Sequence, residues 1–170
     1  MHVNGYRPGA DGLDLWIGRR AADKKVAPDK LDNLVAGGIS TGYDAHATLV
    51  KEAAEEADVP EALALRARPA GAMMYRMEQA DGMRDDVLFS YDLAVAPDFV
   101  PRNTDGEIAS FQIMALAECL RRVDETDDFK FNVNLVLIDF AIRHGAIGPE
   151  HPDYLALIGA LHGGMMRGPA

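Results

Sequence analysis

Apolar and polar positions follow two periods along this chain, which predict strands and helices in turn. Alternating patterns and short apolar runs predict strands over residues 2–7, 13–19, 34–36, 70–78, 87–94 and 109–114. Apolar positions three and four residues apart predict helices over residues 45–57, 60–66, 116–125, 131–143 and 152–161. Turn signals predict a connection at residues 8–12 and a β-hairpin around Asp81-Gly82. This mixture predicts an α/β fold.

The patterned region contains no internal repeat and no linker-rich boundary. We therefore expect a single domain over residues 1–162, long enough to bury a substantial core. From residue 163 the pattern is lost, so residues 163–170 are expected to form a mobile tail.

A glycine turn leads into a helix that carries carboxylates on one side. The turn begins at Gly37-Gly38, and Glu52, Glu55 and Glu56 follow at helical positions i, i+3 and i+4. Like charges at this spacing repel one another unless a cation lies among them. Mg²⁺ prefers oxygen ligands, so the pattern indicates metal-assisted attack on a phosphate or diphosphate. From the helix alone, a solvated acidic face explains the pattern equally well.

This segment resembles the Nudix box, a glycine-led loop and helix with the pattern G-x5-E-x7-R-E-U-x-E-E-x-G-U, in which U is aliphatic. The match is strongest over residues 37–38 and 51–56. With the second glycine aligned to the first position of the pattern, Asp44 takes the first acidic position, Lys51 replaces arginine and Asp58 replaces the last glycine. The interval between Asp44 and Lys51 holds six residues where the pattern has seven.

These departures carry structural expectations. Lys51 is expected to pair with Asp44, as the arginine and first glutamate of the family do, although lysine lacks the bidentate fork. Asp58 is expected to follow the helix with a positive φ, which Asp tolerates better than most non-glycine residues. The shorter interval affects the loop more than the glutamates, whose spacing is internal to the helix.

The Nudix resemblance implies an α/β/α sandwich with a mixed β-sheet and a hydrolase that uses Mg²⁺, with Mn²⁺ as the alternative. It implies metal ligands from the side chains of Glu52, Glu55 and Glu56 and from the main-chain carbonyl of Gly37. Glu52 is a third ligand or the base that orients water. Glu107 is the second catalytic candidate, because many Nudix enzymes bring a further carboxylate from this region; a plain turn carboxylate is the alternative.

Other segments resemble one branch of the family, related to thiamine pyrophosphokinase and fused with it in some fungi. These segments are residues 2–6, 15–20, 30–38, 105–107, 129–132 and 138–145. The branch resemblance implies hydrolysis of damaged thiamine diphosphates, such as oxo- and oxythiamine diphosphate, to monophosphates. The alternatives are a Nudix pyrophosphatase for ADP-ribose or nucleotide sugars, and a Nudix-fold binding module with little activity.

Three residues are candidates for substrate binding at positions that match this branch. Arg84 would meet the terminal phosphate, although a surface ion pair with its acidic neighbours explains it as well. Lys130 and Asn132 precede or begin a predicted helix, where a phosphate or ring contact is expected; capping is the alternative for Asn132. Aromatic residues that could stack on a flat ring lie in strands, where most are expected to be core: Trp16, Tyr75, Phe89, Tyr91 and Phe111.

The formal net charge of -10 argues against a nucleic-acid partner, whose binding surface would be basic. A small-molecule diphosphate can still bind when Mg²⁺ bridges the two. Cys119 is the only cysteine, and no signal peptide or membrane-length apolar run is apparent, so we expect a cytoplasmic protein without a membrane partner. A homodimer is left open.

Overall fold

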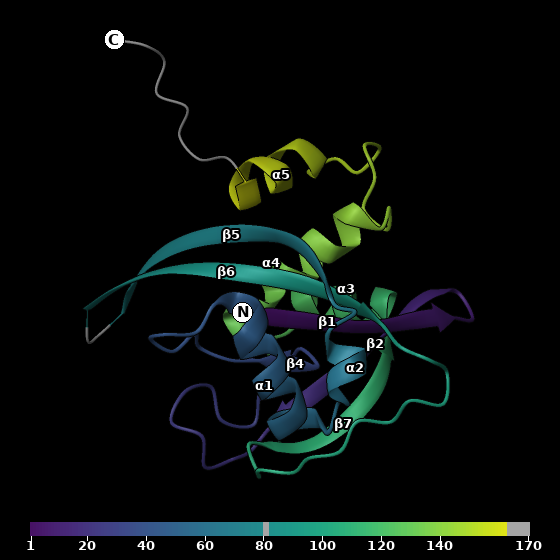
Figure 1. Ribbon diagram of the computed structural model, residues 1–170. Coiled ribbons are helices and arrows are strands. Elements are labelled where there is room, and N and C mark those ends of the chain that lie inside the picture. Colours follow the sequence, from purple (N-terminus) through teal and green to yellow (C-terminus); the bar gives the residue numbers. More distant parts are fainter. Residues whose placement is uncertain (80–81, 163–170) are drawn as a thin grey trace.

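The computed structural model describes residues 1–79 and 82–162 (Figure 1). Its elements are β1 (His2–Gly9), β2 (Gly12–Arg20), β3 (Leu31–Asp32), β4 (Val35–Ala36), α1 (Ala45–Ala57), α2 (Glu61–Ala64), β5 (Arg68–Gln79), β6 (Gly82–Ala94), β7 (Ile108–Ala115), α3 (Leu116–Glu125), α4 (Phe131–Arg143) and α5 (Tyr154–His162). The predicted tail and the tip of the second hairpin lie outside these ranges.

The described strands form one mixed sheet in the order β3-β2-β1-β6-β5, with β4 paired to β1 and β7 paired to β2. β1 and β6 run parallel, from His2 opposite Ser90 to Tyr6 opposite Ala94. The other pairings are antiparallel. The predicted α/β fold with a mixed sheet is therefore confirmed.

Helices cover both faces of this sheet, because neighbouring side chains of a strand point to opposite sides. On β2, Trp16 packs into a core that includes Leu49 of α1. Leu15 and Ile17 pack into a second core, with residues of α3 and α4. Figure 1 shows α1 in front of the sheet and α4 behind it, while α5 lies along β5. Within the described chain, no helix combines the length and apolar character needed to cross a membrane.

The ends of α1 follow from its sequence. Asp44 is the N-cap, and its side chain accepts a hydrogen bond from the backbone N–H of Ala47 at 2.7 Å. Asp58 closes the helix in the left-handed conformation, with φ of 52°. The predicted helix bounds and the positive φ are confirmed.

Strand ends differ more from the prediction. β6 begins at Gly82 rather than residue 87, because its register with β5 continues to Gln79 opposite Gly82. The polar run over residues 84–86 concealed these paired positions. β1 and β2 likewise extend into the predicted turn, with Gly9 opposite Gly12. The strand expected at residues 34–36 is β4, and the short strand β3 before it was not predicted.

Candidate active site

A cleft of about 710 Å³ opens beside α1, bounded by β6, by residues 20–26 and by the start of α4. Its acidic lining residues are Glu52, Glu56, Asp85, Asp86 and Glu107. Its basic lining residues are Arg20, Lys24, Arg84 and Lys130. The cleft therefore combines anions and cations in one lining, as a metal–phosphate complex requires.

Glu56 is the buried carboxylate of this cleft, only 3% exposed. One of its oxygens accepts a hydrogen bond from the backbone N–H of Ala36 at 3.0 Å. Burial raises the pKa of Glu56 to about 8, and the nearby carboxylates of Asp32, Glu52 and Glu107 add to the rise. A cation among these carboxylates would offset both effects.

Glu52 lies against the glycine turn. A Cβ at Gly37 would lie 2.8 Å from Cγ of Glu52, so the side chain can approach only because residue 37 is glycine. The Gly37 carbonyl, a predicted metal ligand, accepts a hydrogen bond from the α-amino group of Met1 at 2.7 Å. A carbonyl oxygen has a second lone pair, so this bond leaves one for another partner.

Glu55 lies outside the lining of the cleft. Its half-exposed carboxylate pairs with Lys51, whose amine also lies 3.3 Å from an oxygen of Glu52. Its part in metal binding stays a prediction, and would require Lys51 to release it. The expected pair between Lys51 and Asp44 is wrong, because Asp44 instead caps α1 and Lys51 bonds within its own turn of the helix.

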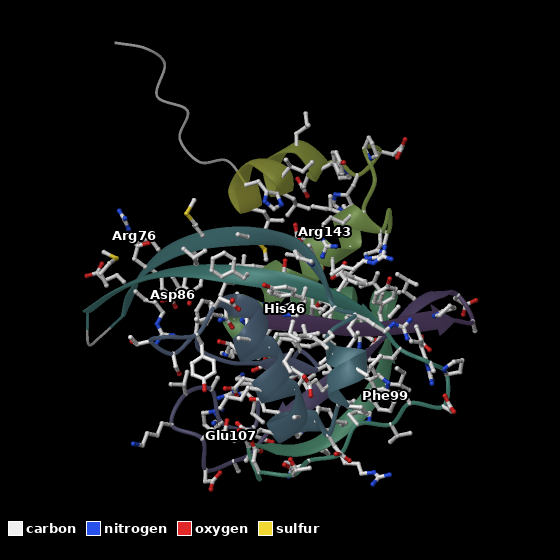
Figure 2. The ribbon with its side chains drawn as sticks, in the orientation of Figure 1. His46, Arg76, Asp86, Phe99, Glu107 and Arg143 are labelled. Carbon is white, nitrogen blue, oxygen red and sulfur yellow. The ribbon has the colours of Figure 1, made fainter. Side chains whose placement is uncertain are left out.

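Glu107 directly precedes β7 and lines the cleft, and its carboxylate pairs with the amine of Lys24. Figure 2 shows Glu107 below α1 and Asp86 on the β5–β6 hairpin above it. Glu107 therefore lines the cleft, and its charge is paired with a lysine from another loop.

The two predicted substrate-binding cations also have partners. Arg84 lies 3.8 Å from a carboxylate oxygen of Asp86, so the local ion pair weighed from the sequence is present, and yet Arg84 lines the cleft. The amine of Lys130 lies 3.6 Å from Asp32, a carboxylate that is 1% exposed. Both cations are thus held at the cleft by acidic neighbours.

Asn132 lines the cleft and is 6% exposed, and its side-chain oxygen has no hydrogen-bond partner among the described residues. The N-cap of α4 is Lys130, without a side-chain cap bond, so the capping alternative for Asn132 is not observed. A buried acceptor without a partner is costly unless a ligand or water supplies a donor. Asn132 is therefore suited to contact a bound molecule.

The cleft lining includes no Phe, Tyr or Trp within the described chain. Trp16 and Tyr91 are core residues, as expected, and Phe111 packs against the same core. Tyr75 contacts Phe131 edge to face at 5.1 Å. The apolar part of the cleft wall consists instead of Met1, Val26, Ala36, Ile39, Val87 and Leu88.

Arg20 and Lys24 are cleft residues that the sequence-based reasoning missed. Arg20 is 7% exposed and lies 2.9 Å from Asp32. The available signal was the Arg19-Arg20 pair at the end of a strand, since alternation turns one of two neighbours inward. Lys24 lies in a loop without a pattern, so nothing in the sequence singled it out.

The side chains of the cleft fit a hard divalent cation. Glu56 is a buried carboxylate with no ion-pair partner among the described residues. Glu52 packs against Gly37, where a Cβ would displace the Glu52 side chain. All the donors are oxygens, which suits Mg²⁺ or Mn²⁺. Among residues 1–79 and 82–162, no three acidic, His or Cys side chains already form a metal-coordinating cluster.

The mixed sheet between helices, with a glycine turn and a carboxylate-bearing helix at the cleft, is the architecture of the Nudix fold. The crystal structure of DR0079 from Deinococcus radiodurans has the same fold, with a TM-score of 0.61 and 24% identity over 79% of this chain and 78% of that one. The Nudix domain of NrtR from Shewanella oneidensis, solved with ADP-ribose, gives a TM-score of 0.61 and 13% identity over 84% of each chain.

Sequence relatives agree with the fold. Nudix hydrolase 24 of Arabidopsis thaliana, described as chloroplastic, is 44% identical over 96% of this chain and 45% of its own length. No family model matches the chain. The chain is similar in sequence to Nudix hydrolases and has the Nudix fold, and it spans about half the length of the curated relatives it matches.

Proposed function

We propose that this protein is a divalent-metal-dependent hydrolase that cleaves a diphosphate linked to an organic group. The observation that carries the proposal is the cleft itself, whose lining combines the carboxylates of Glu52 and Glu56 with the cations of Lys130 and Arg84. Carboxylates alone would repel a diphosphate, and cations alone would not hold a metal. The combination suits a metal–diphosphate complex.

Each side chain has a role in this proposal. Glu56 and Glu52 hold the cation, with Glu55 as a further candidate and the Gly37 carbonyl beside them. Mg²⁺ or Mn²⁺ would supply charge neutralisation at the diphosphate and acidify water. Lys130 and Arg84 bind phosphate oxygens, and Asn132 accepts a hydrogen bond from the substrate or from water.

Hydrolysis then requires a base for water. Glu107 or Glu52 accepts a proton from water. As it does so, the water oxygen forms a bond to phosphorus and the bridging P–O bond breaks. The bridging oxygen leaves with the other phosphoryl group, which takes up a proton. A diphosphate ester yields a monophosphate and inorganic phosphate.

For the organic group we propose an oxidised thiamine analogue, as in oxo- or oxythiamine diphosphate. The support is the branch resemblance at residues 15–20, 30–38 and 129–132, which include cleft residues Arg20, Lys130 and Asn132. The alternative is a nucleoside diphosphate derivative, since the Shewanella domain of this fold was solved with ADP-ribose. A binding module with little activity is the remaining alternative, favoured by the shortened Nudix loop.

The test is Mg²⁺-dependent phosphate release from oxo- and oxythiamine diphosphate, thiamine diphosphate, ADP-ribose and a nucleotide sugar. ADP-ribose and the sugar are assayed with added phosphatase, so that their monophosphate products are counted. Glu56→Gln serves as the inactive control, since the amide cannot replace a carboxylate ligand. Preference for the thiamine analogues supports the substrate, and preference for a nucleotide overturns it. No turnover by folded protein would overturn the enzyme assignment.

A further inference from the structure

The ion pair between Lys24 and Glu107 lies between two cavities. Both residues line the main cleft, and both also line a neighbouring cavity of about 490 Å³. The side chain of Lys24 is 25% exposed and that of Glu107 is 48% exposed. A pair exposed to this extent is weakly stabilising, so a stronger anion can displace one partner at little cost.

The loop over residues 21–30 is held firmly by Arg20. Its guanidinium donates to the carbonyls of Val26 at 2.9 Å and Ala27 at 3.1 Å, and to the carboxylate of Asp32 at 2.9 Å. Ala27 and Asp29 have φ of 47° and 58°, a left-handed conformation that disfavours side chains. The loop shape is therefore imposed by its contacts, and such strain is characteristic of ligand-binding segments.

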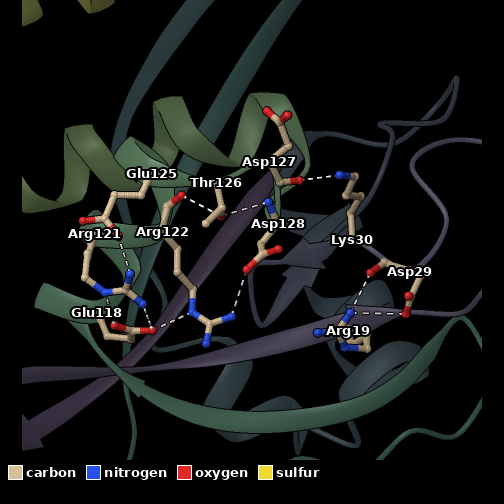
Figure 3. A network of polar contacts seen from close by, with 10 residues as sticks. All are labelled: Arg19, Asp29, Lys30, Glu118, Arg121, Arg122, Glu125, Thr126, Asp127 and Asp128. Atoms are coloured by element: carbon tan, nitrogen blue, oxygen red, sulfur yellow. Dashed lines mark hydrogen bonds and ion pairs between the residues drawn. The ribbon is translucent and has the colours of Figure 1, made fainter.

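The base of the same loop is fastened on both sides. Arg19 donates to the Asp29 carbonyl at 2.8 Å, and Lys30 donates to the carbonyl of Asp127 (Figure 3). The backbone N–H of Ala21 donates to the carbonyl of Glu107 at 2.9 Å. The backbones that carry Lys24 and Glu107 are thus tied together, and exchange of partners requires only movement of the long lysine side chain.

We propose that Lys24 binds a phosphate of the substrate by exchanging Glu107 for it, so that phosphate binding itself releases the Glu107 carboxylate into the cleft. This inference rests on the proposed function. A phosphate group carries more charge than a carboxylate and offers more acceptor oxygens, so it competes well for the same ammonium. Arg20 is the positioning residue that keeps Lys24 at the boundary of the two cavities.

The test is calorimetric binding of imidodiphosphate, which resists hydrolysis, to the whole chain in buffer without Mg²⁺. Lys24→Met is expected to weaken binding by about tenfold, the effect of one charge-assisted hydrogen bond. Lys25→Met is the matched control, because Lys25 is the exposed neighbour in the same loop and lines only the second cavity. An equal loss in both variants, or no loss in Lys24→Met, would overturn the inference.

A double-mutant cycle tests the exchange itself. Glu107→Gln should tighten imidodiphosphate binding, because Lys24 no longer has to leave a carboxylate. That gain should vanish when Lys24 is already Met. A gain of equal size in both backgrounds would mean that Glu107 acts on the ligand directly, and would overturn the exchange.

The binding readout also separates this inference from the proposed function. Silence across the substrate panel would overturn hydrolysis, and the binding cycle would still report on Lys24. Turnover with full affinity in Lys24→Met would overturn the exchange and leave the hydrolase assignment standing.

Discussion

Gly37 shows how one missing Cβ shapes the cleft. An alanine there would place a Cβ 2.8 Å from Cγ of Glu52, whereas a Cβ at Gly38 would meet nothing within 4 Å. We expect Gly37→Ala to lower kcat about ten- to hundredfold by displacing a carboxylate, with Gly38→Ala as the matched control. Steady-state kinetics on the substrate found in the panel measures this. Equal activities of the two variants would contradict the steric account.

His2 gives the protein a pH-dependent stability. Burial lowers the pKa of His2 to about 4, with the nearby cations of Lys130 and the N-terminus acting in the same direction. As the pH falls, His2 therefore becomes protonated near pH 6.5 in the unfolded chain but only near pH 4 in the folded chain. This contribution to stability is complete above about pH 6.5 and is lost as the pH falls toward 4.

A non-titrating residue at position 2 should remove that dependence. We expect the free energy of unfolding of the natural chain to fall, relative to that of His2→Gln, by up to about 3 kcal/mol between pH 6.5 and 4. Urea unfolding of both proteins across this range is the measurement. Parallel pH profiles would show that the imidazole does not carry the effect.

At the scale of elements, the loop over residues 21–30 depends on Arg20. Arg20→Lys keeps the charge and loses the fork that reaches two loop carbonyls and Asp32 together. We expect hydrogen exchange in this loop to speed up by about tenfold or more, while exchange in α3 stays unchanged. Arg19→Lys is the control, because within the described chain Arg19 hydrogen-bonds a single loop residue, Asp29, whereas Arg20 holds two loop carbonyls and Asp32. Equal exchange in both variants would assign the loop's order to other contacts.

The elements best predicted from the sequence are those with local signals. α1, α3 and α4 begin and end where expected, because their periodicity is long and, for α1, Asp44 and Asp58 mark the ends. The prediction placed the start of β6 too late, because residues 84–86 are polar and their pairing with β5 depends on the folded chain. Local patterns do not contain such pairings.

The candidate site divides in the same way. Gly37, Glu52 and Glu56 come from one motif, and the structure brings them to one cleft with Glu107 and Lys130. Side chains that reach the cleft through long-range contacts carry no local signal, as Lys24 illustrates. The Nudix resemblance predicted which sequence positions carry site residues. The ion pair between Lys24 and Glu107 could be seen only in the folded structure.

At the scale of the molecule, a buried polar chain runs from the cleft along the α4 face of the sheet. Asn33 hydrogen-bonds His2 and Asn4, each at 2.9 Å, and Asn4 donates to Asp92 at 3.0 Å. Asp92 pairs with Arg143 of α4, which is labelled in Figure 2. His2 at the cleft and Arg143 near the end of α4 thus belong to one hydrogen-bonded network.

Breaking this chain at its centre should cost stability. Asn4 is 1% exposed, so Asn4→Leu would leave Asn33 and Asp92 each without one partner. We expect a loss of about 1–3 kcal/mol in the free energy of unfolding, measured by urea denaturation. The control is Asp11→Asn in the exposed β1–β2 turn, expected to change stability by less than about 0.5 kcal/mol. A comparable loss in both variants would contradict a special role for the network.

The parallel pairing of β1 with β6 has a consequence for the order of assembly. The β1–β2 and β5–β6 pairs join neighbours along the chain, and each can form early. Their union brings residues 2–6 to residues 90–94, across more than half of the sequence. During synthesis, one edge of β1 therefore has no strand partner until β6 has left the ribosome. That exposed edge is where a half-made chain is most open to mispairing and to chaperone capture.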